Sequence, residues 1–569
     1  MGPSPQRRRL PVPADFERTG PPGPIPYDGG SGDGCPGLRR GATPPAGAEL
    51  RAPVDHHPGL SLQRQLLAVQ LGREGVNKRA EQRTAPLVAI LGLGLLLRLI
   101  ALRTRGIWYD DAFSILLSRR EVTRIVAGTA ADTMPPLYYF LLHAWMGLGT
   151  GIPTLRLLNV LLSLGIIALT YRATFSLLEN RRAALWAALF AAVSPFHIYH
   201  AQELRMYGLL CANLLLYLYF FIRIYLRLDR QGWFSWIGLT VAGALAMYSH
   251  NLALFSLLGA DFLLLLKRRW RLLGRLLLAH ALSFLLAAPW LVMVPGQVAK
   301  IQRAFWTPRP GLLELVQTLV VFHTNLPVPR WMLPISLAGA MLFPTFVVYE
   351  LVRRRWRHLG VQLLAVFSLL PPALTFAASY LMRPLFVPRG IILSSLTYYM
   401  LGGHVVSDQH RRWTHAVLAL IFVIPALLAL PSHYTFDEFP RSRFEQAAAF
   451  LRAHVHPGDV VLHDNKLSYF PMHCYAPELP QVFLPDEPGS HNDTLARASQ
   501  DAMAVWPVKD LQTGTEGAPR LWFVFFTRAV EEYAAMGTPH PVLAELRQEW
   551  RQMNQATFGD LEVILFERR

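Results

Sequence analysis

Long apolar runs alternate with short polar links from about Leu87 to Pro431. Each run approaches the roughly 20 residues that an α-helix needs to cross a bilayer. The pattern therefore predicts eleven transmembrane helices, approximately at residues 87–103, 153–172, 183–199, 207–226, 234–249, 251–266, 275–294, 332–352, 359–380, 390–407 and 413–431.

Lysine and arginine gather before the first run and in every second link after it. Because cytoplasmic loops are rich in these residues, we expect the N-terminus and those links to be cytoplasmic. An odd number of spans then places the remaining links on the outer face, at 104–152, 200–206, 295–331 and 381–389. Two shorter apolar stretches, 136–148 and 312–322, are predicted to lie at the outer interface, because counting either as a span inverts the charge pattern.

The two ends of the chain differ from the membrane part. The first 60 residues contain 13 Pro and 11 Gly, and such a segment buries too little apolar surface to offset its chain entropy. Residues 1–86 are therefore predicted to form a disordered cytoplasmic tail, followed by the transmembrane domain at 87–431. A small extracytoplasmic α/β domain is predicted at 432–569 from a helical pattern and three strand-like runs, at 444–454, 459–463, 520–526 and 561–566.

The composition fits a polytopic membrane protein that is all-α outside this C-terminal domain. The chain is 52% hydrophobic and 16% charged, with a mean hydropathy of +0.27, whereas soluble domains are about 25% charged. The net charge of +17 lies largely in links that flank apolar runs, which favours cytoplasmic loops and anionic headgroups over a nucleic-acid partner. The three cysteines are far apart and suggest neither a disulfide framework nor a thiolate metal site.

The first outer link carries two neighbouring carboxylates, Asp110 and Asp111, between aromatic residues. A carboxylate just outside the membrane can act as a general base or bind a cation such as Mg²⁺ or Ca²⁺, although two side chains make an incomplete shell. The alternative is an interfacial aromatic belt with a solvated acidic pair. Asp132, just before Pro135 and Pro136, is a candidate substrate ligand in the same link.

The second outer link is short and polar and contains Glu203, Arg205 and Tyr207. Charges beside hydrocarbon are costly unless they pair or face a polar cavity, so a functional site is the default interpretation; a structural Glu203–Arg205 ion pair is the alternative. His250 lies at the outer turn of the next hairpin, where a histidine can bind substrate or simply cap and pack.

Cations in the later outer links break the positive-inside trend: Lys300, Arg303 and Arg389. An outer-face arginine needs an anionic partner, and a phosphate suits the guanidinium fork. The alternative for each is a side chain that reaches a lipid phosphate.

Together these stretches resemble bacterial relatives of the dolichyl-phosphate-mannose protein mannosyltransferases, which are glycosyltransferase family 39-like enzymes of the GT-C membrane fold. The resemblance covers roughly residues 87–431. It rests on six modest motifs that occur in the family's order: WYDDAF (108–113), PPLYY (135–139), LRLL (155–158), AQELRMY (201–207), YSH (248–250) and FVPR (386–389).

The resemblance implies a transferase that moves a sugar from a polyprenyl-phosphate-linked donor to an acceptor lipid, glycan or protein at the outer face of the plasma membrane. Asp110 matches the first acidic position of the family's Asp-Glu pair, which implies the catalytic carboxylate, and Asp111 takes the Glu position with a shorter side chain. Glu203, Arg205 and Tyr207 match its Gln-Glu-x-Arg-x-Tyr segment. His250 matches its Tyr-Thr-His-like turn; Arg389 matches an Arg usually followed by Tyr, whereas Gly390 follows here.

The chemistry expected of these residues agrees with the resemblance. Asp110 is expected to accept the proton of an acceptor hydroxyl, while arginine cations stabilise the leaving phosphate, and a single displacement predicts inversion. No glycine-rich nucleotide motif is present. The alternatives are a transporter or lipid-linked sugar flippase, which usually places ionisable groups at mid-bilayer in inverted repeats, and a membrane-anchored scaffold.

Overall fold

The computed structural model describes residues 84–227, 232–303, 307, 309–353, 358–382, 384–408, 412–490 and 493–569. All described residues belong to one compact unit. Residues 1–83 of the predicted tail therefore lie outside the described residues.

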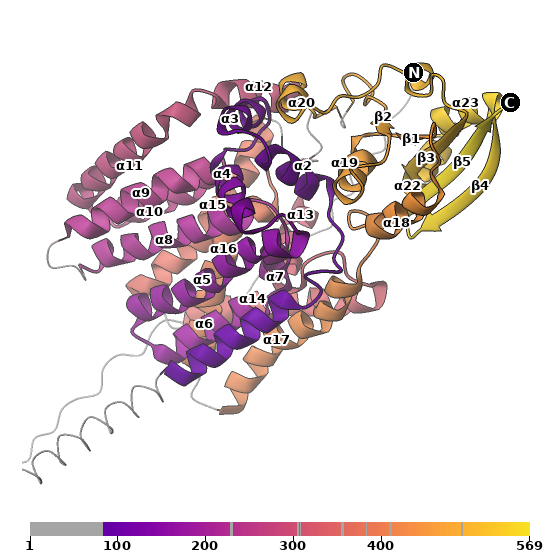
Figure 1. The fold of residues 1–569 in the computed structure, drawn as a ribbon. Helices are drawn as coiled ribbons and strands as arrows, with labels where there is room; N and C mark the ends of the chain where they lie inside the picture. The colour runs from indigo at the N-terminus through magenta and orange to yellow at the C-terminus, as the bar shows by residue number, and fades with distance from the viewer. Residues whose placement is uncertain are drawn as a thin grey trace, which may run out of the picture. The chain divides into compact units, whose positions relative to one another are not determined.

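The membrane part is a bundle of helices joined by short links (Figure 1). Its first helix is Thr84–Leu99. The helices that follow are α2 (Tyr109–Ser118), α3 (Val122–Ala131), α4 (Leu137–Trp145), η1 (Met146–Leu148), α5 (Ile152–Leu178), α6 (Arg181–Val193), α7 (Pro195–Gln202), α8 (Tyr207–Tyr225), α9 (Trp233–Ser249), α10 (Ala253–Leu266), α11 (Trp270–Leu291), α12 (Val294–Arg303), α13 (Leu312–Thr324), η2 (Arg330–Met332), α14 (Leu333–Arg353), α15 (Leu359–Leu381), η3 (Pro388–Ile391), α16 (Ile392–Ser407) and α17 (Arg412–Thr435).

Each predicted span falls on helix in this structure, which confirms a multi-pass helical membrane protein. Within the described residues, six helices are long and apolar enough to cross a membrane: α5, α8, α11, α14 with η2, α15 and α17. The pair α6 and α7 makes a seventh if its two helices, bent by 56°, count as one span. The helices at the other predicted spans are shorter, so the number eleven stays a prediction, as does the orientation.

Helix α16 lies at the centre of the bundle and is buried on nearly all sides. It packs against α6 through a close approach of the two backbones. A Cβ atom on Gly403 would lie 2.6 Å from the carbonyl oxygen of Ala183, so only glycine fits here. Small residues let helices pack closely where lipid supplies no hydrophobic drive for association.

The predicted span 183–199 is broken at Ser194 because Pro195 has no N–H to continue the helix. A buried arginine satisfies the carbonyl groups that the break exposes. Arg98 donates to the carbonyl oxygens of Ala192 (2.8 Å) and Ala191 (3.1 Å), and its Nε donates to the Ser163 hydroxyl (2.7 Å). The break turns α7 and so sets the direction in which the following link leaves the bundle.

We expect Arg98→Met to lower the stability of the protein. The substitution leaves the buried carbonyls of Ala191 and Ala192 without donors, at a cost of about 1–3 kcal/mol for each group. The measurement is the thermal unfolding midpoint in detergent micelles. Arg103→Met, which removes an exposed arginine five residues away, is the control. Equal unfolding midpoints for the two variants would contradict the conclusion that Arg98 stabilises the helix break at Ser194.

The C-terminal part is the small α/β domain that the sequence predicts. Helix α18 and strand β3 have the predicted bounds, β1 and β5 lie within two residues of them, and β2 and β4 were not predicted. Its elements are α18 (Phe444–His454), β1 (Val460–His463), α19 (Lys466–Tyr475), β2 (Gln481–Phe483), α20 (Arg497–Met503), α21 (Leu511–Gly514), β3 (Arg520–Phe526), α22 (Thr527–Ala535), α23 (Pro541–Glu549), β4 (Trp550–Phe558) and β5 (Leu561–Arg568).

The five strands form one sheet in the order β2-β1-β3-β5-β4. Strands β2, β1 and β3 are parallel, whereas β5 is antiparallel to both β3 and β4. Both faces of β3 are covered: Trp522 and Val524 belong to one apolar cluster, Phe523 and Phe525 to another. A strand buried on both faces is apolar without alternation, as the run at 520–526 is.

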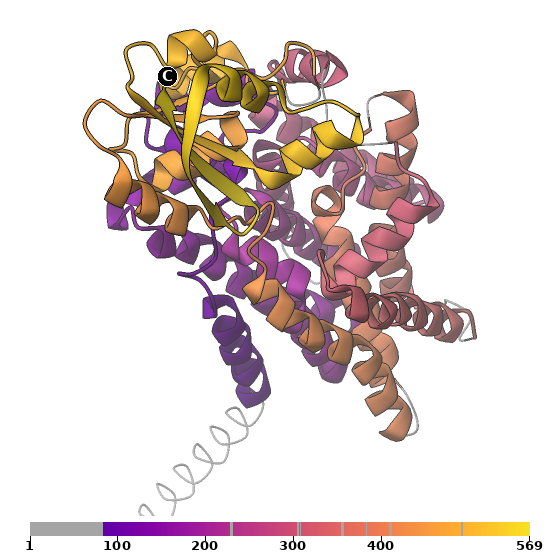
Figure 2. The ribbon, with the colours of Figure 1, turned by 90° about the vertical axis from the view of Figure 1, so that its right-hand side faces the viewer.

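The C-terminal domain packs on the helices that follow the first span (Figures 1 and 2). Its helix α19 contacts α2, and α20 contacts α3. Phe470, Phe483 and Met503 belong to the same buried cluster as the side chains of α2, and the Tyr475 hydroxyl accepts a hydrogen bond from the Ile107 amide (3.2 Å). Helix α2 therefore lies between the membrane part and the C-terminal domain.

Candidate active site

The two neighbouring carboxylates lie in the first turn of α2, where an anionic side chain is favoured by the helix dipole. The Asp110 side chain is 26% exposed. Asp111 is buried, and its oxygens accept backbone N–H groups of Leu204 (2.7 Å) and Trp108 (3.3 Å). The same chemical group thus has two environments, since Asp110 is partly exposed and Asp111 holds α2 to the link between α7 and α8.

The hydrogen bond between Asp111 and the Leu204 amide also places Arg205 next to Asp110. The Nη2 atom of Arg205 lies 3.8 Å from Oδ1 of Asp110, and Nη1 donates to the Tyr139 hydroxyl (3.3 Å). Arg205 is only 5% exposed, yet its Nε has no hydrogen-bond partner. A buried guanidinium with an unused donor is costly, so this position favours an anionic ligand.

Glu203 pairs with a histidine and not with Arg205, so the predicted structural alternative is not the pair that forms. Its carboxylate accepts a hydrogen bond from Nδ1 of the buried His200 (2.9 Å). Burial by itself raises the pKa of Glu203, but the His200 hydrogen bond and the nearby charges of His200, Arg389 and Arg105 lower it to about 2. Glu203 is therefore a fixed anion beside the Asp110–Arg205 pair.

Tyr207, His250 and Arg389 come together from three separate elements. Tyr207 begins α8, and Cζ of Arg389 in η3 lies 5.2 Å from the centroid of its ring. The His250 ring lies beside the Tyr207 ring, with 5.8 Å between the two ring centroids. Its Nδ1 accepts the Leu252 amide (3.1 Å), which leaves the hydrogen on Nε2. The neutral His250 ring therefore offers a hydrogen-bond donor close to two cations, Arg389 and Arg205.

We expect His250 to make the protein less stable in mild acid. Burial first, and then the positive charges of Arg389 and Arg205, lower its pKa to about 3 from 6.5. Between these values the unfolded chain binds the proton and the folded protein does not, so stability is complete above pH 6.5 and declines as the pH falls below it. The loss approaches about 1.4 kcal/mol for each pH unit.

The measurement is the unfolding midpoint between pH 7.5 and pH 5 for the wild type and for His250→Asn, whose amide oxygen can still accept the Leu252 amide. The variant should lose less stability over this range than the wild type. Parallel pH profiles for the two proteins contradict a neutral, buried His250.

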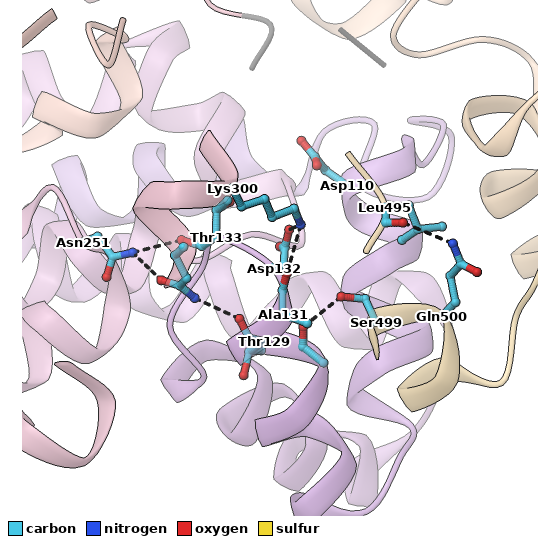
Figure 3. Close-up of polar contacts among 12 residues, drawn as sticks. Asp110, Thr129, Ala131, Asp132, Thr133, Asn251, Lys300, Leu495, Ser499 and Gln500 are labelled. Carbon is cyan, nitrogen blue, oxygen red and sulfur yellow. Dashed lines mark hydrogen bonds and ion pairs between the residues drawn. The ribbon is translucent and has the colours of Figure 1, made fainter. Parts of the chain in front are cut away.

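Asp132 caps α3 and pairs with Lys300 of α12, with 3.5 Å between Oδ1 and Nζ (Figure 3). Lys300 also donates to the Ala131 carbonyl (3.0 Å). The neighbouring carbonyls of this turn are held by side chains from α12, the α9–α10 turn and α20, in the contacts Gln297 to Thr129, Asn251 to Thr133 and Ser499 to Gly128. Asp132 is therefore fixed from three directions.

Two supporting arginines had no predicted role. Arg156, in the LRLL segment of α5, is fully buried and donates to the carbonyl oxygens of Leu102 (2.9 Å), Arg105 (2.7 Å) and Gly106 (3.0 Å). It fixes the chain that enters α2. An arginine in an otherwise apolar span is a signal that could have found it, and Arg98 carries the same signal.

One predicted residue is not placed. The backbone of Arg303 ends α12, but its side chain lies outside the described residues. Among the described residues, no group of three His, Cys, Asp or Glu side chains could hold a metal ion, and the oxygens of Asp111 are used by backbone amides. A divalent cation at this pair stays a prediction.

The sequence and the fold both have known relatives. Residues 133–293 match the sequence model of the dolichyl-phosphate-mannose-protein mannosyltransferase family; this region contains Glu203, Arg205, Tyr207 and His250, and ends before Arg389. The fold is similar to ArnT from Cupriavidus metallidurans bound to undecaprenyl phosphate, with a TM-score of 0.56 and 15% identity over 85% of this chain and 98% of that one.

The apo state of the same ArnT gives a TM-score of 0.57 and 14% identity, with the same coverage of each chain. The chain has the GT-C fold of membrane glycosyltransferases. No curated protein matches the sequence significantly. The family match and the fold together make this chain a membrane glycosyltransferase, and confirm the family resemblance that its motifs indicate.

Proposed function

We propose that this glycosyltransferase moves a sugar from a polyprenyl-phosphate-linked donor to an acceptor hydroxyl at the outer face of the plasma membrane. The observation that carries the proposal is the buried Arg205 guanidinium, with an unpartnered Nε, 3.8 Å from the partly exposed Asp110 carboxylate. A phosphate site and a general base are thus adjacent. ArnT, whose fold this chain shares, binds undecaprenyl phosphate, which supports a lipid-borne donor.

Asp110 is the proposed general base. Its carboxylate takes the proton of the acceptor hydroxyl while that oxygen forms a bond to the anomeric carbon of the donor sugar. The bond from the anomeric carbon to the phosphate oxygen breaks in the same step, and polyprenyl phosphate leaves with the electron pair. A single displacement of this kind inverts the configuration at the anomeric carbon, whereas retention requires a second carboxylate as nucleophile.

Arg205 and Arg389 are the proposed phosphate ligands. Negative charge grows on the phosphate as the sugar leaves, and fixed cations in a site shielded from water stabilise it more in the transition state than in the ground state. Before the donor binds, Arg205 is paired with Asp110. Binding of the phosphate to the guanidinium weakens that pair and leaves Asp110 free to accept a proton.

The remaining predicted residues have supporting roles in this proposal. Asp111 positions Asp110 and Arg205 by holding the Leu204 amide, so we propose it as a positioning residue in place of a second catalytic carboxylate. Tyr207 and the neutral His250 donate hydrogen bonds to the polyprenyl-phosphate-linked sugar. Asp132, paired with Lys300, borders the acceptor side.

Transport is the second candidate function, and the placement of the polar groups disfavours it. The Asp110–Arg205 pair, Glu203 and His250 are in links or at helix ends, whereas transporters usually bind their substrates near the bilayer midplane.

The direct test of the proposal is transfer of a radiolabelled sugar from a polyprenyl-phosphate donor by purified protein in detergent micelles, together with a comparison of envelope glycans from cells with and without the protein. Absence of both transfer and any glycan difference overturns the proposed function.

A further inference from the structure

The C-terminal domain holds a buried ion pair at the carboxyl edge of its parallel strands. Lys466 follows β1 and Asp486 follows β2, and their side chains, 2% and 12% exposed, are hydrogen-bonded to each other. Asp464, also just after β1, lies 3.4 Å from Nε2 of His540. Burying a lysine costs desolvation free energy even when it is paired, so stability alone does not explain why an ion pair is buried at this edge of the sheet.

The edge is the place where a parallel sheet binds ligands. Strand β2 lies on one side of β1 and β3 lies on the other, so the chain reverses its direction of winding at β1. In α/β sheets, ligands bind in the crevice outside the carboxyl ends of the strands at such a switch point. Lys466 and Asp486 are at this switch point.

The same edge faces the candidate active site. Helix α19, which starts at Lys466, packs on α2, and the rings of Phe470 and Tyr109 meet edge to face with centroids 5.1 Å apart. Tyr109 precedes Asp110. Burial first, and then the nearby negative charges of Asp132, Asp110 and Asp486, raise the pKa of its hydroxyl. The helix that starts at this edge of the sheet therefore contacts the residue that precedes Asp110.

We propose that this edge is the acceptor subsite, that Lys466 and Asp486 recognise the acceptor, and that the acceptor is a neutral sugar chain; the inference rests on the proposed function and names its acceptor. Ammonium groups donate and carboxylates accept hydrogen bonds, and sugar hydroxyl groups do both. An anionic acceptor would meet the carboxylates of Asp464 and Asp486, which follow the neighbouring strands β1 and β2 at this edge. A hydroxyl held beside Tyr109 is next to Asp110.

The alternative is that the pair only fastens the link after β2 to α19. Replacing a buried ion pair by apolar residues of similar volume usually keeps or increases stability. The double variant Lys466→Met with Asp486→Leu should therefore fold, and it separates fastening from recognition. The matched control is Arg452→Met with Glu478→Leu, which removes a more exposed ion pair of the same domain. Asp486→Asn, which keeps the side-chain volume, is a second test variant.

The experiment uses the full chain in detergent micelles and saturation-transfer NMR with mannotriose, maltotriose and, as the anionic probe, mannose 6-phosphate. We expect at least one neutral trisaccharide to bind to the wild type and the control, and to bind about tenfold more weakly to the test variants. The Kd for undecaprenyl phosphate should be equal in all of them. In the transfer assay the KM for acceptor should rise while kcat stays within a factor of about two.

The proposal is overturned if the test variants bind the trisaccharides as the wild type does, if no neutral sugar binds to the wild type, or if only mannose 6-phosphate binds. Failure of the proposed function gives a different result. In that case trisaccharide binding still depends on Lys466 and Asp486, but no sugar is transferred from polyprenyl-phospho-mannose or from other polyprenyl-phosphate sugars.

Discussion

Asp110→Asn should reduce sugar transfer by a factor of about 10²–10⁴, the range that a positioned general base contributes. The amide has nearly the shape of the carboxylate but cannot take the proton of the attacking hydroxyl. Binding of undecaprenyl phosphate should persist or improve, because Arg205 loses the Asp110 carboxylate 3.8 Å away and its positive charge is left for the phosphate. The measurement pairs initial transfer rates with the Kd for undecaprenyl phosphate.

Glu121→Gln is the control for this experiment, since it neutralises an exposed carboxylate just before α3. It should transfer sugar at the wild-type rate. A transfer rate for Asp110→Asn within a factor of about three of the wild type would exclude Asp110 as the base. Loss of transfer together with loss of undecaprenyl phosphate binding would indicate a damaged site and not a missing base.

Arg205→Met should be the second most damaging change, with a loss of about 10²–10³ in kcat, the cost of removing one donor that stabilises developing charge. The apolar side chain fills much of the same space beside Tyr139 but offers nothing to the phosphate. In contrast to Asp110→Asn, this variant should also bind undecaprenyl phosphate more weakly. The kcat of Arg205→Lys should lie between those of the wild type and Arg205→Met, because the ammonium group keeps the positive charge but cannot form the two parallel hydrogen bonds of a guanidinium.

Arg119→Met is the matched control for Arg205→Met, because it removes an exposed arginine at the far end of α2. It should keep both the wild-type kcat and the wild-type Kd. If Arg205→Met loses kcat without any change in the Kd for undecaprenyl phosphate, the guanidinium acts on the reaction but does not hold the phosphate in the ground state. An unchanged kcat contradicts the proposed site.

Much of the secondary structure could be predicted because each element has a strong local signal. Helix α18 and strand β3 have the predicted bounds, and the predicted spans fall on helices. Strand β4 was missed because its residues after Trp550 are mostly polar and exposed. It is an edge strand held by its pairing with β5 across the turn at Gly559, whose φ is +69°. Pairing with a neighbour, and not the local pattern, makes it a strand.

The candidate site was predictable only as a set of residues on one side of the membrane. The sequence suggested a Glu203–Arg205 pair as the structural alternative, but Glu203 binds His200 and Arg205 lies beside Asp110. These partners depend on where α7 points after the break at Ser194, which rests on the guanidinium of Arg98 from another helix. Contacts of this kind have no sequence periodicity.

The sequence by itself determined that the chain is a polytopic helical membrane protein with a small α/β domain, because the transfer of apolar runs into lipid depends on local composition. It also determined which polar residues had to be explained, since a charge beside hydrocarbon is costly wherever it finally lies. Only the tertiary structure decided that Asp111 holds the backbone while Asp110 is partly exposed, and that α19 of the C-terminal domain, which starts at Lys466, packs on the same α2. Electrostatic and hydrogen-bond partners are set by distances of a few ångströms between segments far apart in the chain, and packing alone fixes those distances.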